Sequence, residues 1–315
     1  MTGSDAVAIV GGGSIGVAFA VRFAGAGRQV RLFDPFADAL DRAGEELREW
    51  LKLLEGHGML VDSADETLAR VRLTSDLDEA VADAVLLQEC APERVDLKQD
   101  LLTAAVRGLP ATAVLASSSS AIAPSILAAG LPADVARRLL VAHPANPPYL
   151  LPVIELVPSP DTGADVVERA RQLYAAVGMR PVLVHHEPEG FVFNRLQGAL
   201  LREAYCLVRD GVATVDDIDE VVRSGLGRRW SFMGPFETVD LNTRGGLASH
   251  AEKMGPAYAR MGAERGQDDP WTPELVADAV AQRRAVLPLD AWADRVQWRD
   301  EQLLRLTPVW EGQNG

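Results

Sequence analysis

Short runs of apolar residues alternate, over the first 187 residues, with segments whose apolar positions recur at helical spacing. Apolar runs of this length, bounded by polar, Gly-rich or Pro-rich segments, predict β-strands. The predicted strands are Ala6–Val10, Gln29–Phe33, Val71–Thr74, Ala84–Glu89, Thr112–Ala116, Leu139–Ala142, Val153–Val157 and Pro181–Val184. The clearest helical patterns between them are Phe36–Leu54, Arg94–Arg107 and Ala164–Val177. This alternation predicts an α/β fold with a Rossmann-type doubly wound sheet, whose ligands lie beyond the carboxyl ends of the strands.

The pattern changes from Glu189 onward, where helical spacing replaces the alternation. The predicted helices are Phe191–Arg209, Val215–Ser224, Trp271–Val286 and Leu289–Leu306. Thr214 followed by Asp217 is typical of a helix start, and Pro273 suits a first helical turn. The sequence therefore predicts a Rossmann domain over residues 1–187 and a mostly α-helical C-terminal domain over residues 188–315.

A glycine-rich segment, Gly11-Gly12-Gly13-Ser14-Ile15-Gly16, directly follows the first predicted strand. In the pattern G-x-G-x-x-G, the first glycine permits a sharp turn and the second lets backbone amides approach a pyrophosphate. The third glycine lets the following helix pack against the strand, and the start of that helix presents unpaired N–H groups to the phosphates. The residues expected to bind a dinucleotide here are Gly11, Gly13, Ser14, Ile15 and Gly16.

Asp34 stands at the end of the second predicted strand. A carboxylate at this position accepts hydrogen bonds from a ribose 2′-hydroxyl and repels a 2′-phosphate. Pro35 and Phe36 follow, where an NADP enzyme usually supplies an arginine. The motif and Asp34 together predict a site that prefers NAD over NADP. The alternative is a glycine-rich turn with an unrelated aspartate.

Composition narrows the class of protein further. The 315 residues are 48% hydrophobic and 24% charged, which suits one large core or two smaller ones. The formal net charge of -14 argues against a nucleic-acid partner, because such a partner requires a basic face.

We expect no membrane partner, because no apolar run approaches the length of about 18 residues that a spanning helix needs. The first strand also begins too early for a signal peptide. Cys90 and Cys206 suit reduced, buried thiols, and we expect a cytoplasmic protein.

Several polar residues occupy the ends of later strands or the start of the second domain. They are the run Ser117–Ser120, His143, Glu155 and Asn194. Each alone has a structural explanation: a serine run forms a polar turn, a histidine donates a structural hydrogen bond, and an acid in a strand faces solvent. The pair His185-His186 does not predict a metal site, because neighbouring side chains of an extended segment point to opposite sides. We expect no bound metal.

Taken together, these residues resemble one family. The segments that carry the resemblance are Ser117–Ser120, His143–Pro158, Gly190–Gln197, Gly225–Trp230 and Met233–Glu237. In this order they resemble the L-3-hydroxyacyl-CoA dehydrogenase superfamily, and within it most closely the lambda-crystallin type, whose activity is L-gulonate 3-dehydrogenase. The resemblance extends from about Val7 to Asn242.

The resemblance implies a set of catalytic residues, namely His143, Glu155, Ser120 and Asn194. By position, His143 is the catalytic base, Glu155 is its carboxylate partner, Ser120 binds substrate and Asn194 holds the reacting oxygen. The chemistry agrees, because oxidation of a secondary alcohol by NAD needs a base for the hydroxyl proton, and a neutral imidazole is suitable near pH 7. The same matching implies contacts with the nicotinamide side and ribose of NAD from Glu93, Lys98 and Asn146. The resemblance also implies a homodimer.

The substrate class depends mainly on Arg229, which matches an arginine of the gulonate-type pattern. A guanidinium can hold a carboxylate through two parallel hydrogen bonds. The alternative is that Arg228 and Arg229 form a solvated helix end. Pro144 and Ala145 follow His143 where acyl-CoA dehydrogenases usually carry aromatic residues, which disfavours a thioester substrate.

We therefore expect NAD-dependent oxidation of the 3-hydroxyl of a small, L-gulonate-like hydroxy acid to the 3-keto acid. One alternative is a 3-hydroxyacyl-CoA such as 3-hydroxybutyryl-CoA. Another is carnitine, because carnitine dehydrogenases share a similar Tyr-Leu-Leu-Pro stretch. A protein that binds NAD without catalysis is the remaining alternative.

Overall fold

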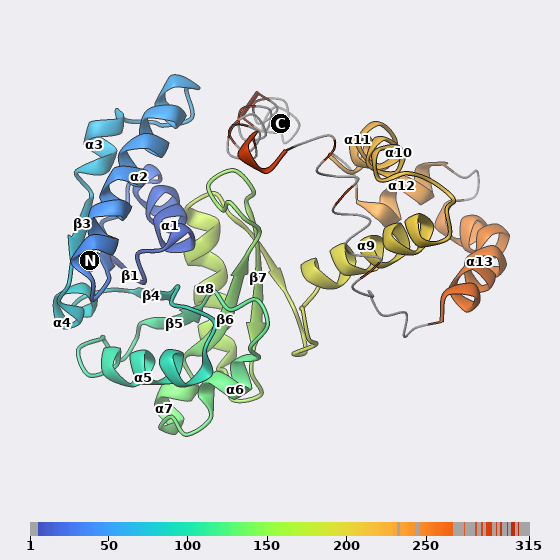
Figure 1. The fold of residues 1–315 in the computed structure, drawn as a ribbon. Coiled ribbons are helices and arrows are strands. Elements are labelled where there is room, and N and C mark those ends of the chain that lie inside the picture. The colour runs from blue at the N-terminus through green and yellow to red at the C-terminus, as the bar shows by residue number, and fades with distance from the viewer. Residues whose placement is uncertain are drawn as a thin grey trace. The chain divides into compact units, whose positions relative to one another are not determined.

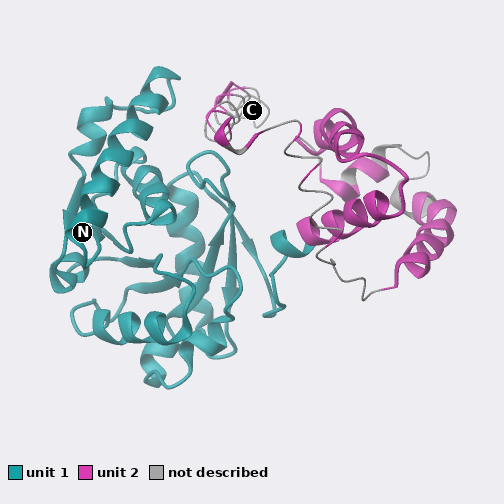
Figure 2. Cartoon of the chain, in the orientation of Figure 1, with its two compact units in different colours: residues 1–195 teal, residues 196–315 magenta. Residues whose placement is uncertain are grey.

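A computed structural model of the chain describes residues 6–231, 234–242 and 246–266, together with isolated positions between 274 and 308. The chain forms two compact units, residues 1–195 and 196–315 (Figure 2). The division follows the first residues of the helix that begins the predicted C-terminal domain, a few residues beyond the predicted boundary at 187.

Unit 1 is built on one eight-stranded sheet with the order β3-β2-β1-β4-β5-β6-β7-β8 (Figure 1). The strands are β1 (Val7–Val10), β2 (Val30–Phe33), β3 (Val71–Thr74), β4 (Leu86–Glu89), β5 (Val114–Ser117), β6 (Leu139–Pro144), β7 (Val153–Pro158) and β8 (Arg180–Leu183). All eight predicted strands are present, with ends displaced by up to a few residues. The central strands β1, β4, β5 and β6 are buried along their whole length, as expected for strands covered on both faces. The predicted Rossmann-type α/β class is confirmed.

The longer helices of unit 1 are α1 (Ser14–Gly25), α2 (Ala37–Gly56), α5 (Val95–Ala105) and α8 (Ala164–Ala176). Helices α2, α5 and α8 are close to their predicted ranges, and α1 is the helix expected after the glycine-rich segment. The shorter helices were not predicted: α3 (Ala64–Leu68), α4 (Leu77–Val81), α6 (Pro124–Ala128) and α7 (Ala133–Ala136). Helices of four or five residues are too short to display a helical period. A local signal was nevertheless present for α3, because Ser63 and Glu66 form a capping box.

Apolar side chains from the central strands and their covering helices form a core that holds the carboxyl ends of β1, β4 and β5 in place. Its fully buried members include Val10, Leu87, Leu102, Leu115 and Leu139. Burial of each such side chain contributes about 1.5–3 kcal/mol relative to exposure. The loops that carry the polar residues therefore start from rigid strand ends.

One strand pair departs from the parallel arrangement of the other described strands. Strand β7 runs antiparallel to β6, and the two lie side by side in the sheet (Figure 1). In this register His143 is directly opposite Glu155. Directly opposed side chains on adjacent strands lie on the same face of the sheet, with Cβ atoms about 4.5–5.5 Å apart. The strand pairing alone therefore brings these two side chains together.

The described part of unit 2 is helical, as predicted. Its elements are α9 (Phe193–Arg209, which begins in unit 1), α10 (Val215–Val221), a π-helical turn η1 (Val222–Leu226), α11 (Gly227–Trp230), α12 (Pro235–Asn242), α13 (Gly246–Arg265) and the 3₁₀ turn η2 (Leu289–Ala291). Thr214 and Asp217 form the predicted capping box of α10. The predicted helices Trp271–Val286 and Leu289–Leu306, and Pro273, lie largely or wholly outside the described residues. Helices α12 and α13 were not predicted, and Pro256 inside α13 interrupts the pattern that would indicate a helix.

None of the helices in the described parts of the chain combines the length and the apolar composition needed to cross a membrane.

Candidate active site

The glycine-rich turn between β1 and α1 has the backbone geometry that its sequence predicts. Gly11 has φ of +116°, and a Cβ atom there would lie 2.7 Å from the carbonyl oxygen of Cys90. A Cβ atom at Gly16 would lie 1.9 Å from the carbonyl oxygen of Gly11. Real Cβ atoms do not approach so closely, so the turn closes onto β4 and α1 only with glycine at both positions.

Gly13 lies at the open side of this turn, as the N-cap residue of α1. A Cβ atom at Gly13 would meet no protein atom within 4 Å, and both Gly13 and Ser14 are exposed. Asp34 lies beside the turn: its Oδ2 accepts a hydrogen bond from the Gly12 amide at 2.9 Å, and its Oδ1 accepts one from the Phe36 amide at 3.1 Å. An exposed helix start next to a carboxylate is the donor and acceptor set that a pyrophosphate and a ribose require, so these residues fit NAD.

His143, Glu155 and Ser120 form a continuous hydrogen-bonded group in unit 1. The Nδ1 atom of His143 lies 2.8 Å from Oε2 of Glu155, and its Nε2 atom lies 3.1 Å from Oγ of Ser120. His143 and Glu155 are buried, whereas Ser120 is exposed. The group thus joins a buried acid to an exposed hydroxyl through one imidazole.

The carboxylate of Glu155 is also bound at the start of α9. Its Oε1 accepts hydrogen bonds from the backbone amides of Val192 at 2.7 Å and Phe193 at 2.9 Å. Burial acts to raise the pKa of Glu155, but the hydrogen bonds from His143 and from these two amides outweigh it and lower the pKa below its ordinary value. Glu155 is therefore an anion at neutral pH.

Two aromatic rings and an amide surround the imidazole. The rings of Phe191 and Phe193 lie with centroids 5.6 Å and 6.5 Å from that of His143. Phe191 has φ of +50°, a conformation that non-glycine residues rarely adopt. The Nδ2 atom of Asn194 donates to the carbonyl oxygen of Ser120 at 3.5 Å. The four residues predicted to be catalytic are therefore brought together from the loop after β5, from β6, from β7 and from α9.

A second cluster of charges lies at the ends of β4 and β5. Lys98 is buried and donates from Nζ to both carboxylate oxygens of Glu89, at 2.8 and 3.0 Å, and to the carbonyl oxygen of Ala91 at 2.9 Å. Glu93 lies 3.4 Å from the same ammonium group. The predicted contacts of Glu93 and Lys98 with NAD stay predictions. Glu89 was not predicted as part of the site, although an acid in the last position of an apolar run is a visible signal.

The remaining predicted site residues are Asn146 and Arg229. Asn146 is exposed in the loop between β6 and β7. Arg229 lies in α11 of unit 2, directly after η1. The backbone is tightly packed where η1 meets α11, since a Cβ atom at Gly227 would lie only 2.9 Å from the carbonyl oxygen of Val222. Single π-helical turns are frequent at functional sites. Among the residues that the structure describes, Arg229 forms no ion pair, whereas nearby Arg223 pairs with Glu220.

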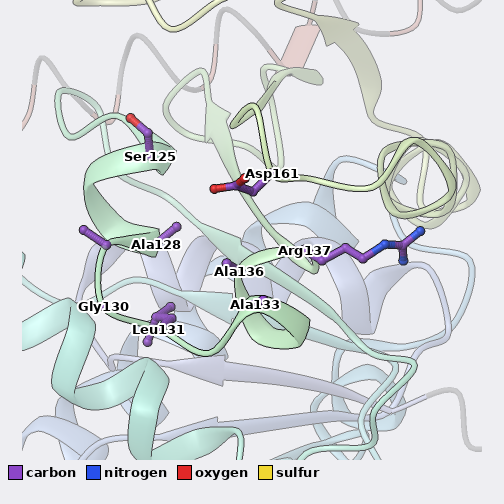
Figure 3. A pocket seen from close by; sticks show the side chains of 9 residues that line it. Ser125, Ala128, Gly130, Leu131, Ala133, Ala136, Arg137 and Asp161 are labelled. Atoms are coloured by element: carbon purple, nitrogen blue, oxygen red, sulfur yellow. The ribbon is translucent and has the colours of Figure 1, made fainter.

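A separate hollow on unit 1 is lined by residues of α6, α7 and the loops beside them (Figure 3). It contains none of the predicted site residues. Its one cationic side chain, Arg137, extends away from the apolar lining and pairs with Asp165 at 2.6 Å. Within the described residues, no group of three or more His, Cys, Asp or Glu side chains is arranged to hold a metal ion.

Family models account for most of the chain. Residues 6–187 match the NAD binding domain of 3-hydroxyacyl-CoA dehydrogenase, and residues 190–286 match the C-terminal domain of the same family. The chain belongs to the 3-hydroxyacyl-CoA dehydrogenase family. It is accordingly an NAD-dependent oxidoreductase, as the glycine turn and Asp34 predicted.

Relatives within this family have several different names. The lambda-crystallin homolog of Bos taurus is 41% identical over 311 residues, which cover 96% of this chain and 95% of that protein. The L-carnitine dehydrogenase of Streptomyces griseus is 38% identical over 304 residues, covering 92% and 87%. Among solved structures, an NAD+-dependent 5-formyl-3-hydroxy-2-methylpyridine 4-carboxylic acid 5-dehydrogenase has a TM-score of 0.83 at 28% identity, covering 98% and 99%. The resemblance to the lambda-crystallin type is confirmed.

Replacement of Glu155 by Gln is expected to change how stability depends on pH. The folded protein holds the pKa of Glu155 below its unfolded value of about 4.3, so the ionised form adds stability that is present above that value and lost as the pH falls through the folded pKa. The difference in free energy of unfolding between wild type and Glu155→Gln should be largest above about pH 5 and shrink below about pH 4. Urea unfolding across this range measures it, and a difference that grows on acidification contradicts the assignment.

Proposed function

We propose that the chain uses NAD to oxidise the 3-hydroxyl of a small hydroxy acid, similar to L-gulonate, to the 3-keto acid. The observation that carries the proposal is the hydrogen-bonded series Glu155, His143 and Ser120, which ends at an exposed hydroxyl. A protein that only binds NAD has no need of a buried acid and imidazole that lead to its surface. This arrangement therefore favours catalysis over binding alone.

The protonation states follow from the donors and acceptors. The Glu155 carboxylate can only accept, so Nδ1 of His143 carries a proton, and in the neutral imidazole Nε2 then has the lone pair. Nε2 is then the base that takes the hydroxyl proton, and Glu155 stabilises the imidazolium that forms. When substrate is bound, the Ser120 hydroxyl turns its one proton from Nε2 to the reacting oxygen, and together with Asn194 it fixes the orientation of that oxygen. Gly11, Gly13, Ser14, Ile15, Gly16 and Asp34 would hold NAD, which when bound would supply the hydride acceptor for the same carbon.

Net charge and the guanidinium of Arg229 favour a small carboxylate substrate over an acyl-CoA. Coenzyme A carries several phosphate charges, which a chain of net charge -14 disfavours at long range. A guanidinium with no ion-pair partner in the described part of the chain is available to a substrate carboxylate. The relatives named for L-carnitine and for a pyridine carboxylic acid are also consistent with a free acid. The family name keeps 3-hydroxyacyl-CoA as the second candidate.

Comparison of kcat/KM for four substrates tests this ranking, with NADH formation followed by absorbance. The substrates are L-gulonate, L-3-hydroxybutyrate, L-carnitine and L-3-hydroxybutyryl-CoA. We expect the highest value for L-gulonate. A preference for the CoA ester overturns the proposal, and a preference for carnitine keeps the mechanism but changes the substrate.

Arg229→Gln is expected to raise KM for the preferred hydroxy acid by about 10²-fold, because a bidentate, charge-assisted pair of hydrogen bonds is lost. The affinity for NADH should be unchanged. Arg228→Gln is the matched control, since it removes the neighbouring guanidinium of the same short helix. Steady-state kinetics and NADH titration give both quantities. Equal effects of the two substitutions contradict a specific role of Arg229.

We also propose that residues 1–187 form the NAD-binding domain and residues 188–315 the substrate and dimerisation domain, with Glu93, Lys98 and Asn146 contacting NAD. Exposed apolar side chains on unit 2, including Leu196, Val212, Val221, Phe236 and Tyr258, support a homodimer. A monomeric mass by light scattering contradicts it. We also propose a cytoplasmic location, because Cys90 and Cys206 lie far apart in the sequence in apolar segments, which suits reduced thiols.

A further inference from the structure

We propose that Glu93 and Ser119 are positioning residues that hold Ser120 in reach of His143, an inference that rests on the proposed role of Ser120 in the reaction. Both residues act on the serine loop, which we define as residues Ser117–Ile122 and which begins with the last residue of β5. Ser120 is exposed, yet its Oγ lies 3.1 Å from a buried imidazole nitrogen. A side chain on an exposed loop keeps such a contact only if the backbone of the loop is fixed.

One carboxylate oxygen fixes that backbone. Oε1 of Glu93 accepts hydrogen bonds from Oγ of Ser119 at 2.5 Å, from the amide of Ser120 at 3.0 Å and from the amide of Ala121 at 3.1 Å. Successive amides that converge on one anion form a concave backbone turn. The amide of Ser120 itself is one of these donors, so the position of Ser120 depends directly on Glu93.

Ser119 supports the same turn from inside the protein. Its side chain is buried, and its Oγ accepts a hydrogen bond from the amide of Ile122 at 2.8 Å while donating to Glu93. Ser119 is 1% exposed, and its hydroxyl is already bonded to Glu93 and to the Ile122 amide, so its side chain is not offered to NAD or substrate. Any effect of Ser119 on turnover must therefore pass through the loop.

Lys98 fixes the carboxylate in turn. Its ammonium lies between the carboxylates of Glu89 and Glu93. Oε2 of Glu89 also accepts a hydrogen bond from Oγ of Ser117 at 2.5 Å. The serine loop is thus bound at Ser117 by one acid and at Ser119 by the other, with Lys98 between them. Burial acts to raise the pKa of Glu93, but Ser119 and Lys98 lower it overall, which keeps the acceptor charged.

This role differs from the contact with NAD that the family resemblance implies for Glu93. A residue that only contacts the cofactor changes the affinity for NADH, and its effect is independent of Ser120. A residue that positions Ser120 changes kcat, and its effect disappears once the Ser120 hydroxyl is gone. A double-mutant cycle separates the two roles.

The experiment measures kcat at saturating NAD for Glu93→Gln and Ser119→Ala, each in the wild-type and the Ser120→Ala background, with the best hydroxy acid of the panel above. A displacement of a catalytic group by about 1 Å lowers the rate by up to about 10²-fold. We therefore expect each substitution to lower kcat by about 10- to 100-fold in the wild-type background. In the Ser120→Ala background we expect a change of less than about twofold. Ser119→Ala should leave the Kd of NADH within about twofold of wild type.

Glu187→Gln is the matched control, because Glu187 also accepts a backbone hydrogen bond, from the Ser125 amide at 2.7 Å, but has no contact with the serine loop in the described structure. A second readout is the ¹⁵N resonance of His143 Nε2, which should move in Glu93→Gln and Ser119→Ala as it does in Ser120→Ala, and stay unchanged in Glu187→Gln.

Equal losses in both backgrounds overturn the inference while leaving the role of Ser120 intact. Wild-type turnover of Ser120→Ala overturns the role of Ser120 on which the inference rests, whereas the absence of NADH formation with every hydroxy acid of the panel overturns the proposed function. If Glu93→Gln does not fold, the Ser119→Ala cycle and its resonance decide the question.

Discussion

His143→Gln is expected to lose about 10²- to 10⁴-fold in kcat, which is the contribution of a positioned general base. Glutamine keeps polar atoms near the position of the imidazole but cannot take a proton near pH 7. The affinity for NADH should be nearly unchanged, because the glycine turn and Asp34 lie on other elements. Stopped-flow or steady-state kinetics with the preferred hydroxy acid, combined with fluorescence titration of NADH, measure both effects.

His186→Gln is a suitable control, since His186 is exposed and lies beyond the end of β8. Glu155→Gln should lower kcat less than His143→Gln does, because it removes the partner of the base and keeps the base itself. Full turnover of His143→Gln refutes the assignment. A loss of NADH affinity in Glu155→Gln, with turnover preserved, means that the acid belongs to the cofactor site.

The second large effect concerns the choice between dinucleotides. We expect NADPH to bind at least about 10²-fold more weakly than NADH, because a 2′-phosphate beside the Asp34 carboxylate places like charges together at a cost of several kcal/mol. The Gly12 and Phe36 amides hold this carboxylate beside the turn, so it cannot easily move aside. Fluorescence titration gives the two Kd values.

Asp34→Asn provides the control for charge, because the amide oxygen can still accept a hydrogen bond from the Gly12 amide. This variant should bind NADH more weakly than wild type does. The ratio of the Kd for NADPH to the Kd for NADH should therefore become smaller. Comparable Kd values for NADH and NADPH in the wild-type protein contradict the role of Asp34.

Most of the fold could be predicted because its central strands are buried on both faces, and buried strands appear as uninterrupted apolar runs. Ala6–Val10 and Leu139–Ala142 are examples that the structure reproduces within two residues at each end. The short helices α6 and α7 have no comparable signal. The antiparallel direction of β7 also leaves no trace in the sequence, since Val153–Val157 is the same apolar run in either direction.

The candidate site was predicted less completely. His143, Glu155 and Ser120 were recognised by resemblance, and the structure brings them within hydrogen-bond distance. Glu89 and Ser119 were missed because each contributes only through neighbours distant in sequence: Glu89 through Lys98, and Ser119 through Glu93. Such roles depend on contacts that appear only when the ends of β4 and β5 are assembled.

The antiparallel ladder of β6 and β7 has a consequence for how such a protein can diversify. The match between imidazole and acid is set by inter-strand registry, and a slip of one residue would turn one of them to the opposite face. The loop that joins the two strands does not set that match. Changes in the loop that keep Asn146 and the packing of its buried residues can therefore accumulate while the pairing of imidazole and acid is preserved. Evolution toward a new hydroxy acid can remodel this segment without rebuilding the acid–base pair.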